Sequence, residues 1–217
     1  MRCITAITPS TRRPGRFSID VDDREVATLS IEAIERLNLA VGTPLDDATA
    51  DDVERESGML ATYDRAMNML AVRGRAAMDL RRALIKKGEP PPFVETAIGR
   101  LEVAGFLDDR AYAAEFVRSK VLAAGMSRRR VQQELAKRGV ARDIAIEATN
   151  TVFADEGLDE QSSIERVARR KLRALASADS VTRQRRLYAF LARRGYDASD
   201  ISQIMRTLLR DASQQTE

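Results

Sequence analysis

Hydrophobic positions in the first 58 residues predict short strands followed by a helix. The segments "RCITAIT", "RFSIDV" and "EVATLSI" are short β-rich runs, connected by "PSTRRPG" and by the acidic turn "DD". In the next segment, "SIEAIERLNL", Ser30 is an expected N-cap, and Ile31, Ile34 and Leu37 lie at helical spacing. "VGTPLDDATADDVERES" then indicates a turn and an acidic helix start. A small N-terminal β-rich α+β unit is therefore expected over residues 1–58.

From Leu60 onward the apolar period is about 3.6 residues, and one short phrase occurs three times. The phrases "LIKKG", "LAKRG" and "LARRG" end at Gly88, Gly139 and Gly195, which are 51 and 56 residues apart. Such spacings leave room for three helices per repeat. We expect the boundary with the N-terminal unit near Ser57 or Gly58, followed by three-helix repeats over 59–108, 109–158 and 159–217.

The three repeats are predicted to contain their helices in the same order, with the second helix ending at the repeated glycine. Apolar residues at helical spacing mark the inner face of each first helix and each third helix. Because such repeats seldom bury their apolar faces alone, the expected fold is mainly α, with tandem helix-turn-helix-like repeats stacked into an elongated curved solenoid. The inner faces are formed by Tyr63, Met67, Leu70, Tyr112, Phe116, Val117, Ile164, Val167, Ala168 and Leu175 for the first helices, and by Val94, Ala97, Ile98, Leu101, Ile144, Ala148, Val152, Ile201, Ile204, Met205 and Leu208 for the third.

Composition excludes most familiar active sites. The chain has 217 residues, 44% hydrophobic and 32% charged, which suits a soluble protein with a buried core, and no apolar run has the length of a signal peptide or a membrane span. We therefore expect a cytoplasmic protein. Cys3 is the only cysteine and histidine is absent, so an internal disulfide, a CxxC metal pair and a histidine site are all excluded. No phosphate-binding glycine loop or nucleophile elbow occurs, and we expect neither a cofactor nor enzyme activity.

Charge is divided unevenly along the chain. Residues 1–58 contain 7 basic and 12 acidic residues, a net charge of −5, whereas residues 59–217 contain 29 basic and 21 acidic residues, a net charge of +8. The repeated part is therefore the basic part. A basic balance in a helical region favours nucleic acid or another acidic surface as partner.

The cations before each repeated glycine have two interpretations, and the sequence leaves both open. A glycine just past a helix end adopts the left-handed cap conformation at low cost, and cations in the last turn favour the helix dipole by about 0.3–1 kcal/mol each. Capping alone can therefore explain the phrase. The alternative is a basic binding face, because Arg129 and Arg130 precede Gly139 by ten and nine residues, and the same spacing recurs before Gly195.

The first repeat departs from this pattern, since Met78 and Asp79 occupy the corresponding positions and its basic pair lies one turn later. The basic face is therefore expected to be strongest in the second and third repeats. Its candidate residues are Arg81, Arg82, Lys86, Lys87, Arg128, Arg129, Arg130, Lys137, Arg138, Arg185, Arg186, Arg193 and Arg194, with Arg12, Arg13 and Arg16, at the tip of a hairpin turned by "PG", as minor candidates for phosphate contact.

Two other kinds of site are disfavoured by the residues present. The third helices "FVETAIGRL" and "IAIEATNTV" are apolar or acidic, which argues against base readout in the major groove, and phenylalanine and tyrosine make up only about 5% of the chain for base stacking. Asp108 and Asp109 lack a third metal ligand, and an Asp directly before "RAYAAEFVRSK" is typical of an N-cap. The remaining possibilities are sequence-independent contact with phosphates and contact with an acidic protein groove.

Four segments, taken together, resemble the bacterial RecX regulatory proteins: "LRRALIKKG", "GFLDDRAYAAEFVRSK", "GMSRRRVQQELAKRGV" and "RRLYAFLARRGY". The resemblance covers about residues 60–210, and the N-terminal β-rich unit is similar to an extension of some members. It implies tandem three-helix repeats and a non-enzymatic protein that binds the RecA filament on single-stranded DNA, and we expect a monomer. Such a protein would dampen ATP hydrolysis and strand exchange, and so modulate recombination, DNA repair and the SOS response, with only weak, non-specific affinity for single-stranded DNA itself.

One position departs from the family. The second helix of the first repeat has Ala76 where a capping Ser or Thr is frequent, whereas Ser127 retains the cap in the second repeat. Losing a cap costs about 1 kcal/mol, so a weaker start of that helix is expected. Two further hypotheses are a general nucleic-acid-binding helical protein, recognised by RecA-independent binding with a steep salt dependence, and a metal-dependent nuclease using Asp108 and Asp109.

Overall fold

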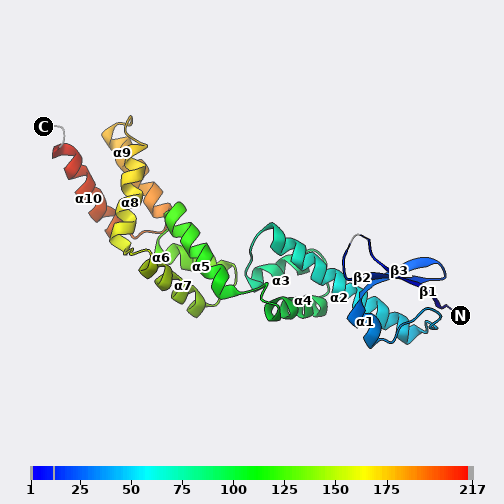
Figure 1. Cartoon of the computed structure of the whole chain (residues 1–217). Coiled ribbons are helices and arrows are strands. Elements are labelled where there is room, and N and C mark those ends of the chain that lie inside the picture. The colour runs from blue at the N-terminus through cyan, green and yellow to red at the C-terminus, as the bar shows by residue number, and fades with distance from the viewer. Residues whose placement is uncertain (1, 12, 215–217) are drawn as a thin grey trace. The chain divides into compact units, whose positions relative to one another are not determined.

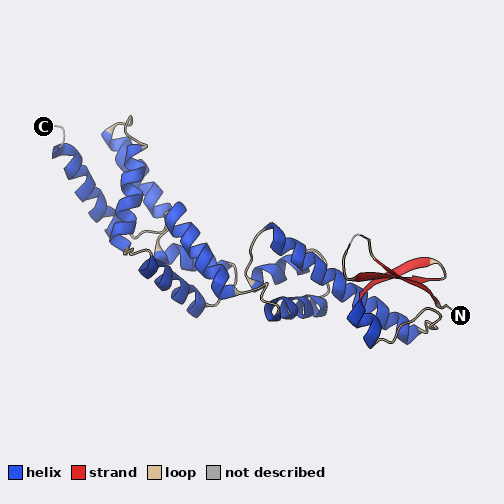
Figure 2. Ribbon diagram, in the orientation of Figure 1, coloured by secondary structure: helices blue, strands red, loops and turns tan. Residues whose placement is uncertain are grey.

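The computed structural model describes residues 2–11 and 13–214, with side chains as far as Leu208. The chain is mainly helical, with a small sheet at its N-terminal end (Figures 1 and 2). It divides into two compact units, which are described separately below. Unit 1 consists of Met1–Arg75 and Asp79–Leu107, and unit 2 consists of Ala76–Met78 and Asp108–Glu217.

Unit 1 begins with a three-stranded antiparallel sheet in the order β1-β2-β3. Its turn between β2 and β3 holds Asp22 and Asp23 at φ values of 49° and 64°, because a two-residue hairpin turn requires left-handed backbone. Ser30 caps the short helix α1 by accepting a hydrogen bond from the Ala33 backbone N–H, as predicted. The strands are β1 (Ile4–Pro9), β2 (Arg16–Val21) and β3 (Arg24–Ser30), followed by α1 (Ile31–Arg36).

A single long helix, α2 (Asp47–Val72), follows the sheet and passes without interruption through Ser57 and Gly58. Gly58 has a packing role there, because a Cβ at this position would lie 2.5 Å from Cε2 of Phe93 on α4 (Pro91–Val103). The change in sequence composition at this glycine thus falls inside a helix. The division into residues 1–58, 59–108, 109–158 and 159–217 stays a prediction.

The third helix of the first repeat, α4, buries the predicted face of Val94, Ala97, Ile98 and Leu101. It packs against α2 within unit 1. The second helix, α3 (Ala77–Lys86), is shared between the units, because Ala76–Met78 at its start belong to unit 2.

Unit 2 contains the remaining helices of the described chain. One core cluster holds Val117, Leu135, Val152 and Phe153 together with Ala76. A second holds most of the predicted apolar residues of the third repeat, but not Leu175, which lies beyond the end of the first helix of that repeat. These elements confirm a mainly α fold with three-helix repeats. Their bounds are α5 (Asp109–Arg118), the π-helix η1 (Ser119–Ala123), α6 (Arg128–Lys137), α7 (Arg142–Asp155), α8 (Glu160–Arg173), α9 (Ser180–Arg193) and α10 (Ala198–Gln214).

Candidate functional site

The repeated glycines end the three second helices in the same way. Gly88, Gly139 and Gly195 have φ values of 88°, 83° and 86°. In each case the residue after the glycine donates its backbone N–H to a carbonyl five residues earlier, at 3.2, 3.1 and 3.4 Å respectively. This bond is typical of a Schellman cap and satisfies carbonyls that the helix leaves unpaired. The glycine of each phrase is therefore a helix cap.

Two of these glycines also lie against the preceding repeat. A Cβ on Gly195 would come 2.5 Å from Cβ of Arg130 and 2.9 Å from Oγ of Ser127, both at the start of α6. A Cβ on Gly139 would clash in the same manner with Met78 at the start of α3, whereas nothing lies within 4 Å of that position on Gly88. The end of one second helix thus packs closely against the start of the second helix before it.

Carboxylates at the start of one repeat cap the second helix of the preceding repeat. Asp109 accepts a hydrogen bond from the Ala77 backbone N–H at 2.8 Å, and Glu160, at the equivalent position of the next repeat, accepts from the backbone N–H of Arg128. Burial nevertheless raises the pKa of Glu160. The cap missing at Ala76 is therefore supplied by Asp109, so the expectation of a weakened start of α3 is corrected.

Three arginines of the third repeat bind the carbonyl groups at the end of the π-helix η1. The donors are Arg166 to Val121 at 3.3 Å, Arg170 to Ala123 at 3.4 Å and Arg194 to Ala124 at 2.7 Å. Arg166 and Arg170 are not among the predicted cations, although their spacing of four residues on one basic helix indicates a shared face. Burial lowers the pKa of Arg194, whose guanidinium also lies 3.6 Å from the ring centroid of Phe190.

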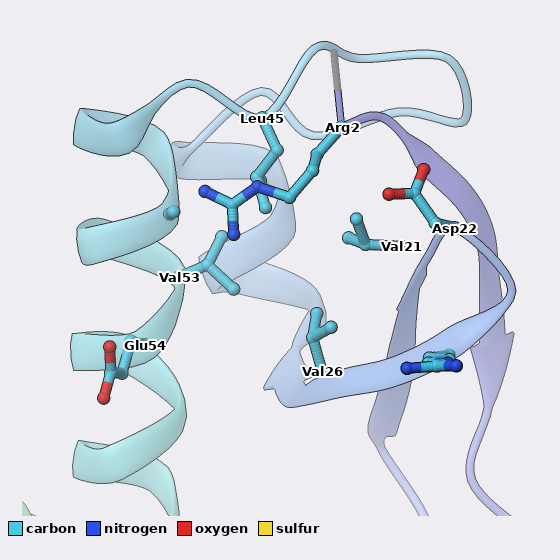
Figure 3. A pocket seen from close by; sticks show the side chains of 9 residues that line it. Arg2, Val21, Asp22, Val26, Leu45, Val53 and Glu54 are labelled. Atoms are coloured by element: carbon cyan, nitrogen blue, oxygen red, sulfur yellow. The ribbon is translucent and has the colours of Figure 1, made fainter.

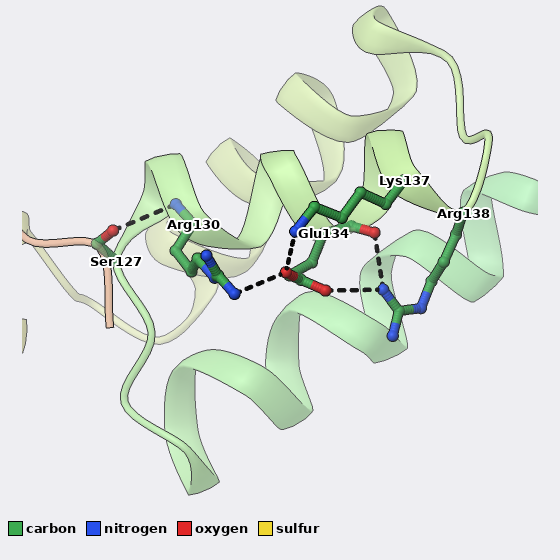
Figure 4. Close-up of polar contacts among 5 residues, drawn as sticks. All are labelled: Ser127, Arg130, Glu134, Lys137 and Arg138. Carbon is green, nitrogen blue, oxygen red and sulfur yellow. Dashed lines mark hydrogen bonds and ion pairs between the residues drawn. The ribbon is translucent and has the colours of Figure 1, made fainter. Parts of the chain in front are cut away.

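A cluster of three predicted cations surrounds Glu134 on α6 (Figure 4). Arg130, Lys137 and Arg138 lie 3.0, 3.0 and 3.2 Å from its carboxylate, and the side chain of Glu134 is only 16% exposed. The hydrogen bond from Lys137, supported by that from Arg138, lowers the pKa of Glu134. Arg138 additionally lies over the ring of Phe116, so its charge already contacts groups within unit 2.

Other predicted cations are also engaged in their own unit. Arg81 forms two hydrogen bonds to Glu95 at 2.7 and 2.8 Å, and Arg129 forms an ion pair with Asp197 at 3.0 Å. Arg128 lies 3.8 Å from the ring centroid of Phe153. Arg82 is exposed on α3.

Five predicted cations differ from these because they are exposed and form no ion pair within the described part of the chain. Two follow or end α3 in unit 1, and three lie on α9 in unit 2. Their charges are therefore available to a partner. They are Lys86, Lys87, Arg185, Arg186 and Arg193.

The predicted arginines of the N-terminal hairpin bind a neighbouring helix. Arg16 and Arg13 lie 2.8 and 3.3 Å from the carboxylate of Asp64 on α2. Their charge is thus partly neutralised within unit 1. Arg12 lies outside the described residues.

The acidic pair that could have suggested a metal site forms helix caps. Asp108 accepts hydrogen bonds from the Arg110 and Ala111 backbone N–H groups at the start of α5, while Asp109 caps α3. Across residues 2–11 and 13–214, no three acidic, histidine or cysteine side chains gather in a way that could hold a metal ion. Within the same residues no helix has both the length and the apolar character that crossing a membrane requires.

Unit 1 also contains a pocket between α2 and the sheet, with a volume of about 560 Å³ (Figure 3). Its lining combines the apolar side chains of Val21, Val26 and Val53 with charged groups such as Arg2 and Glu54. No serine, threonine, cysteine or histidine lies among its lining residues.

Comparisons with known proteins match all three repeats. The RecX first three-helix domain matches residues 63–101, the second matches 108–148 and the third matches 159–205. The chain is 36% identical over 144 residues to the Regulatory protein RecX of Amycolatopsis mediterranei (strain U-32), covering 66% of this chain and 81% of the relative. It is 24% identical over 218 residues to that of Bacillus subtilis (strain 168), covering 100% and 81%.

The fold is likewise similar to solved RecX structures. A crystal structure of regulatory protein RecX superimposes with a TM-score of 0.72 at 20% sequence identity, covering 95% of this chain and 100% of the other. RecX from Lactobacillus salivarius gives a TM-score of 0.54 at 18% identity, covering 70% and 96%. The three matched domains and the identity to curated relatives together establish that this chain belongs to the RecX family of regulatory proteins.

Proposed function

We propose that this RecX-family chain is a negative regulator of the RecA recombinase. It binds the RecA filament on single-stranded DNA, along the filament groove, and inhibits ATP hydrolysis, filament growth and strand exchange. It acts as a monomer in the cytoplasm and is not an enzyme. Through this inhibition it modulates recombination, DNA repair and the SOS response.

The observation that carries the proposal is the division of the repeated cations into two groups. Arg130, Arg138 and Arg194 are used by the fold, whereas the exposed set of Lys86, Lys87, Arg185, Arg186 and Arg193 forms no ion pair within the described residues. Leaving several like charges without partners within one unit, as on α9, opposes folding slightly, so a binding role accounts for these cations better than a structural one. Phosphates and acidic protein surfaces are both suitable partners for such cations.

The test is ATP hydrolysis by the cognate RecA on single-stranded DNA, titrated with this protein well below one copy per RecA protomer. Inhibition at such ratios is expected, because a protein that binds a filament affects many protomers at once. An unchanged hydrolysis rate even at excess protein would refute the proposal. The control is the same titration with the charge-reversed variant Arg185→Glu/Arg186→Glu, which should inhibit more weakly while retaining its helical signal.

A second candidate function is general nucleic-acid binding without RecA. The net charge of +8 over residues 59–217, with 29 basic against 21 acidic residues, favours it. It predicts binding to DNA alone with a steep salt dependence, the logarithm of the affinity falling by about 0.7 to 0.9 per phosphate contact for each tenfold rise in salt. Strong binding of this kind, without inhibition of RecA, would favour the second candidate.

A further inference from the structure

The outward face of α9 carries an exposed tyrosine. Tyr188 is 42% exposed, and in the described part of the chain its ring takes part in no aromatic pair or cation–ring contact. The other tyrosines differ, since Tyr196 is only 4% exposed and Tyr63 and Tyr112 are half-buried. The Phe190 ring on the same helix is already covered by Lys171 and Arg194. Tyr188 is therefore the tyrosine whose ring a partner can reach.

One arginine neighbours this ring on the same helix, and two more lie farther around it. Arg185 precedes Tyr188 by three residues, which makes the two side chains neighbours on the helix surface. Arg186 and Arg193 lie seven residues apart and share a face about 140–160° around the helix from Tyr188, beyond Arg185, and all three arginines are exposed. The helix itself, "SVTRQRRLYAFLAR", contains no acidic residue. The flanking carboxylates are occupied, because Asp179 caps α9 and Asp197 pairs with Arg129.

An exposed aromatic ring among unpaired cations fits one class of partner. Single-stranded nucleic acid offers unstacked bases, which stack on aromatic rings, and phosphates, which bind arginine. In a duplex the faces of the bases are buried by stacking, so a duplex would bind the arginines without contacting the tyrosine ring. An acidic protein segment would also bind the arginines but has no need of an exposed ring.

We propose that the outward face of α9 is a binding site for single-stranded nucleic acid. One base stacks on Tyr188 and a phosphate next to it binds Arg185, while phosphates farther along the strand bind Arg186 and Arg193, which lie farther around the helix. This inference deepens the proposed function, on which it rests, because it assigns the contact with the DNA strand to the second helix of the third repeat. The site recognises a base by its flat surface and therefore shows little preference among sequences.

The test compares two labelled oligonucleotides with the full-length protein in the absence of RecA. One is oligo(dT), and the other is an abasic strand of equal length that keeps the phosphates and lacks the bases. Fluorescence anisotropy at low salt is expected to give about tenfold tighter binding to oligo(dT), the difference that one stacked base supplies. Equal affinity for the two strands would overturn the proposal.

Variants on α9 then identify the ring responsible. Tyr188→Ala is expected to lose the preference for oligo(dT) and bind both strands equally, whereas Tyr188→Phe keeps the preference because it keeps the ring. Val181→Ala is the matched control, since Val181 is 76% exposed on the same helix and cannot stack. A preference that persists in Tyr188→Ala would overturn the proposal.

Photo-cross-linking gives an independent readout. An oligonucleotide with 5-iododeoxyuridine forms a covalent bond to an aromatic side chain stacked on the base, and the cross-linked peptide of wild-type protein is expected to contain Tyr188. Cross-links confined to other peptides would contradict the site. Because RecA is absent, these results are separate from the ATP hydrolysis test: inhibition of RecA without base-dependent binding would refute the α9 site and leave the proposed function intact.

Discussion

Replacing the repeated glycines by alanine separates their two structural roles. The perturbation is Gly195→Ala, compared with Gly157→Ala in the same unit. Both glycines have left-handed backbone, at φ values of 86° and 60°, so alanine is strained at either position. Only Gly195 has a close neighbour, because nothing lies within 4 Å of a Cβ built on Gly157. The pair therefore differs chiefly in the contact with the preceding repeat.

The expected magnitudes follow from this geometry. Left-handed backbone costs alanine about 1–2 kcal/mol at both positions. At Gly195 the new methyl group would also lie 2.5 Å from Cβ of Arg130, which is attached directly to the backbone of α6 and cannot rotate away. Such overpacking costs about 1–3 kcal/mol more. The free energy of unfolding of unit 2 is thus expected to fall by about 1–3 kcal/mol more in Gly195→Ala than in Gly157→Ala.

The assay is urea-induced unfolding followed by circular dichroism, with both variants compared in the same transition. Two further variants extend the series: Gly139→Ala should behave like Gly195→Ala because of Met78, and Gly88→Ala should behave like Gly157→Ala because its surroundings are open. Equal losses for Gly195→Ala and Gly157→Ala would refute the reasoning. The glycine would then serve the helix cap alone, and the close approach of successive repeats would contribute nothing to stability.

Three further predictions follow from single contacts. Asp109→Ala should cost about 1 kcal/mol and increase hydrogen exchange at the Ala77 amide, because that N–H loses its acceptor; unchanged exchange would contradict the cap. Glu134→Gln should lower stability at pH 7 by less than about 1 kcal/mol. The folded pKa of Glu134 is lowered, so the difference from wild type should be complete above the unfolded pKa of about 4.3 and vanish as pH falls through the folded value, as urea titrations between pH 3 and 7 would reveal. Arg194→Lys should destabilise unit 2 by about 1–2 kcal/mol, because lysine cannot reproduce both the stacking on Phe190 and the bond to Ala124, whereas Arg193→Lys should leave thermal stability unchanged.

Much of the fold could be predicted from the sequence because local signals and tertiary packing agree. The period of Val94, Ala97, Ile98 and Leu101 predicted a helix face that is fully buried. The boundary expected near Ser57 or Gly58 stays a prediction, but the sequence did not reveal the packing role of Gly58 inside α2. That role is to admit the ring of Phe93, a contact between residues far apart in the chain that no local pattern encodes.

The positions of the repeated cations on the second helices could be predicted from the sequence, but their contacts within the fold could be predicted only in part. The cations of the second helices lie where the repeated phrase placed them, but the sequence could not separate Arg194, which binds Ala124, from its neighbour Arg193, which is exposed. The difference arises because adjacent residues point to different sides of a helix, and of the two only Arg194 contacts the preceding repeat. Similarly, Asp109 was recognised as a residue near a helix start, while its bond to Ala77 depends on how two repeats pack.

The measurement that tests the central claim most directly is co-sedimentation of this protein with RecA filaments held on single-stranded DNA by a non-hydrolysable ATP analogue. Wild-type protein should sediment with the filaments, and Arg185→Glu/Arg186→Glu should remain largely in the supernatant. The matched control, Arg142→Glu/Arg206→Glu, makes the same change of charge on the third helices α7 and α10 and should sediment like wild type. Equal sedimentation of both variants and wild type, or no sedimentation of wild type, would contradict the account.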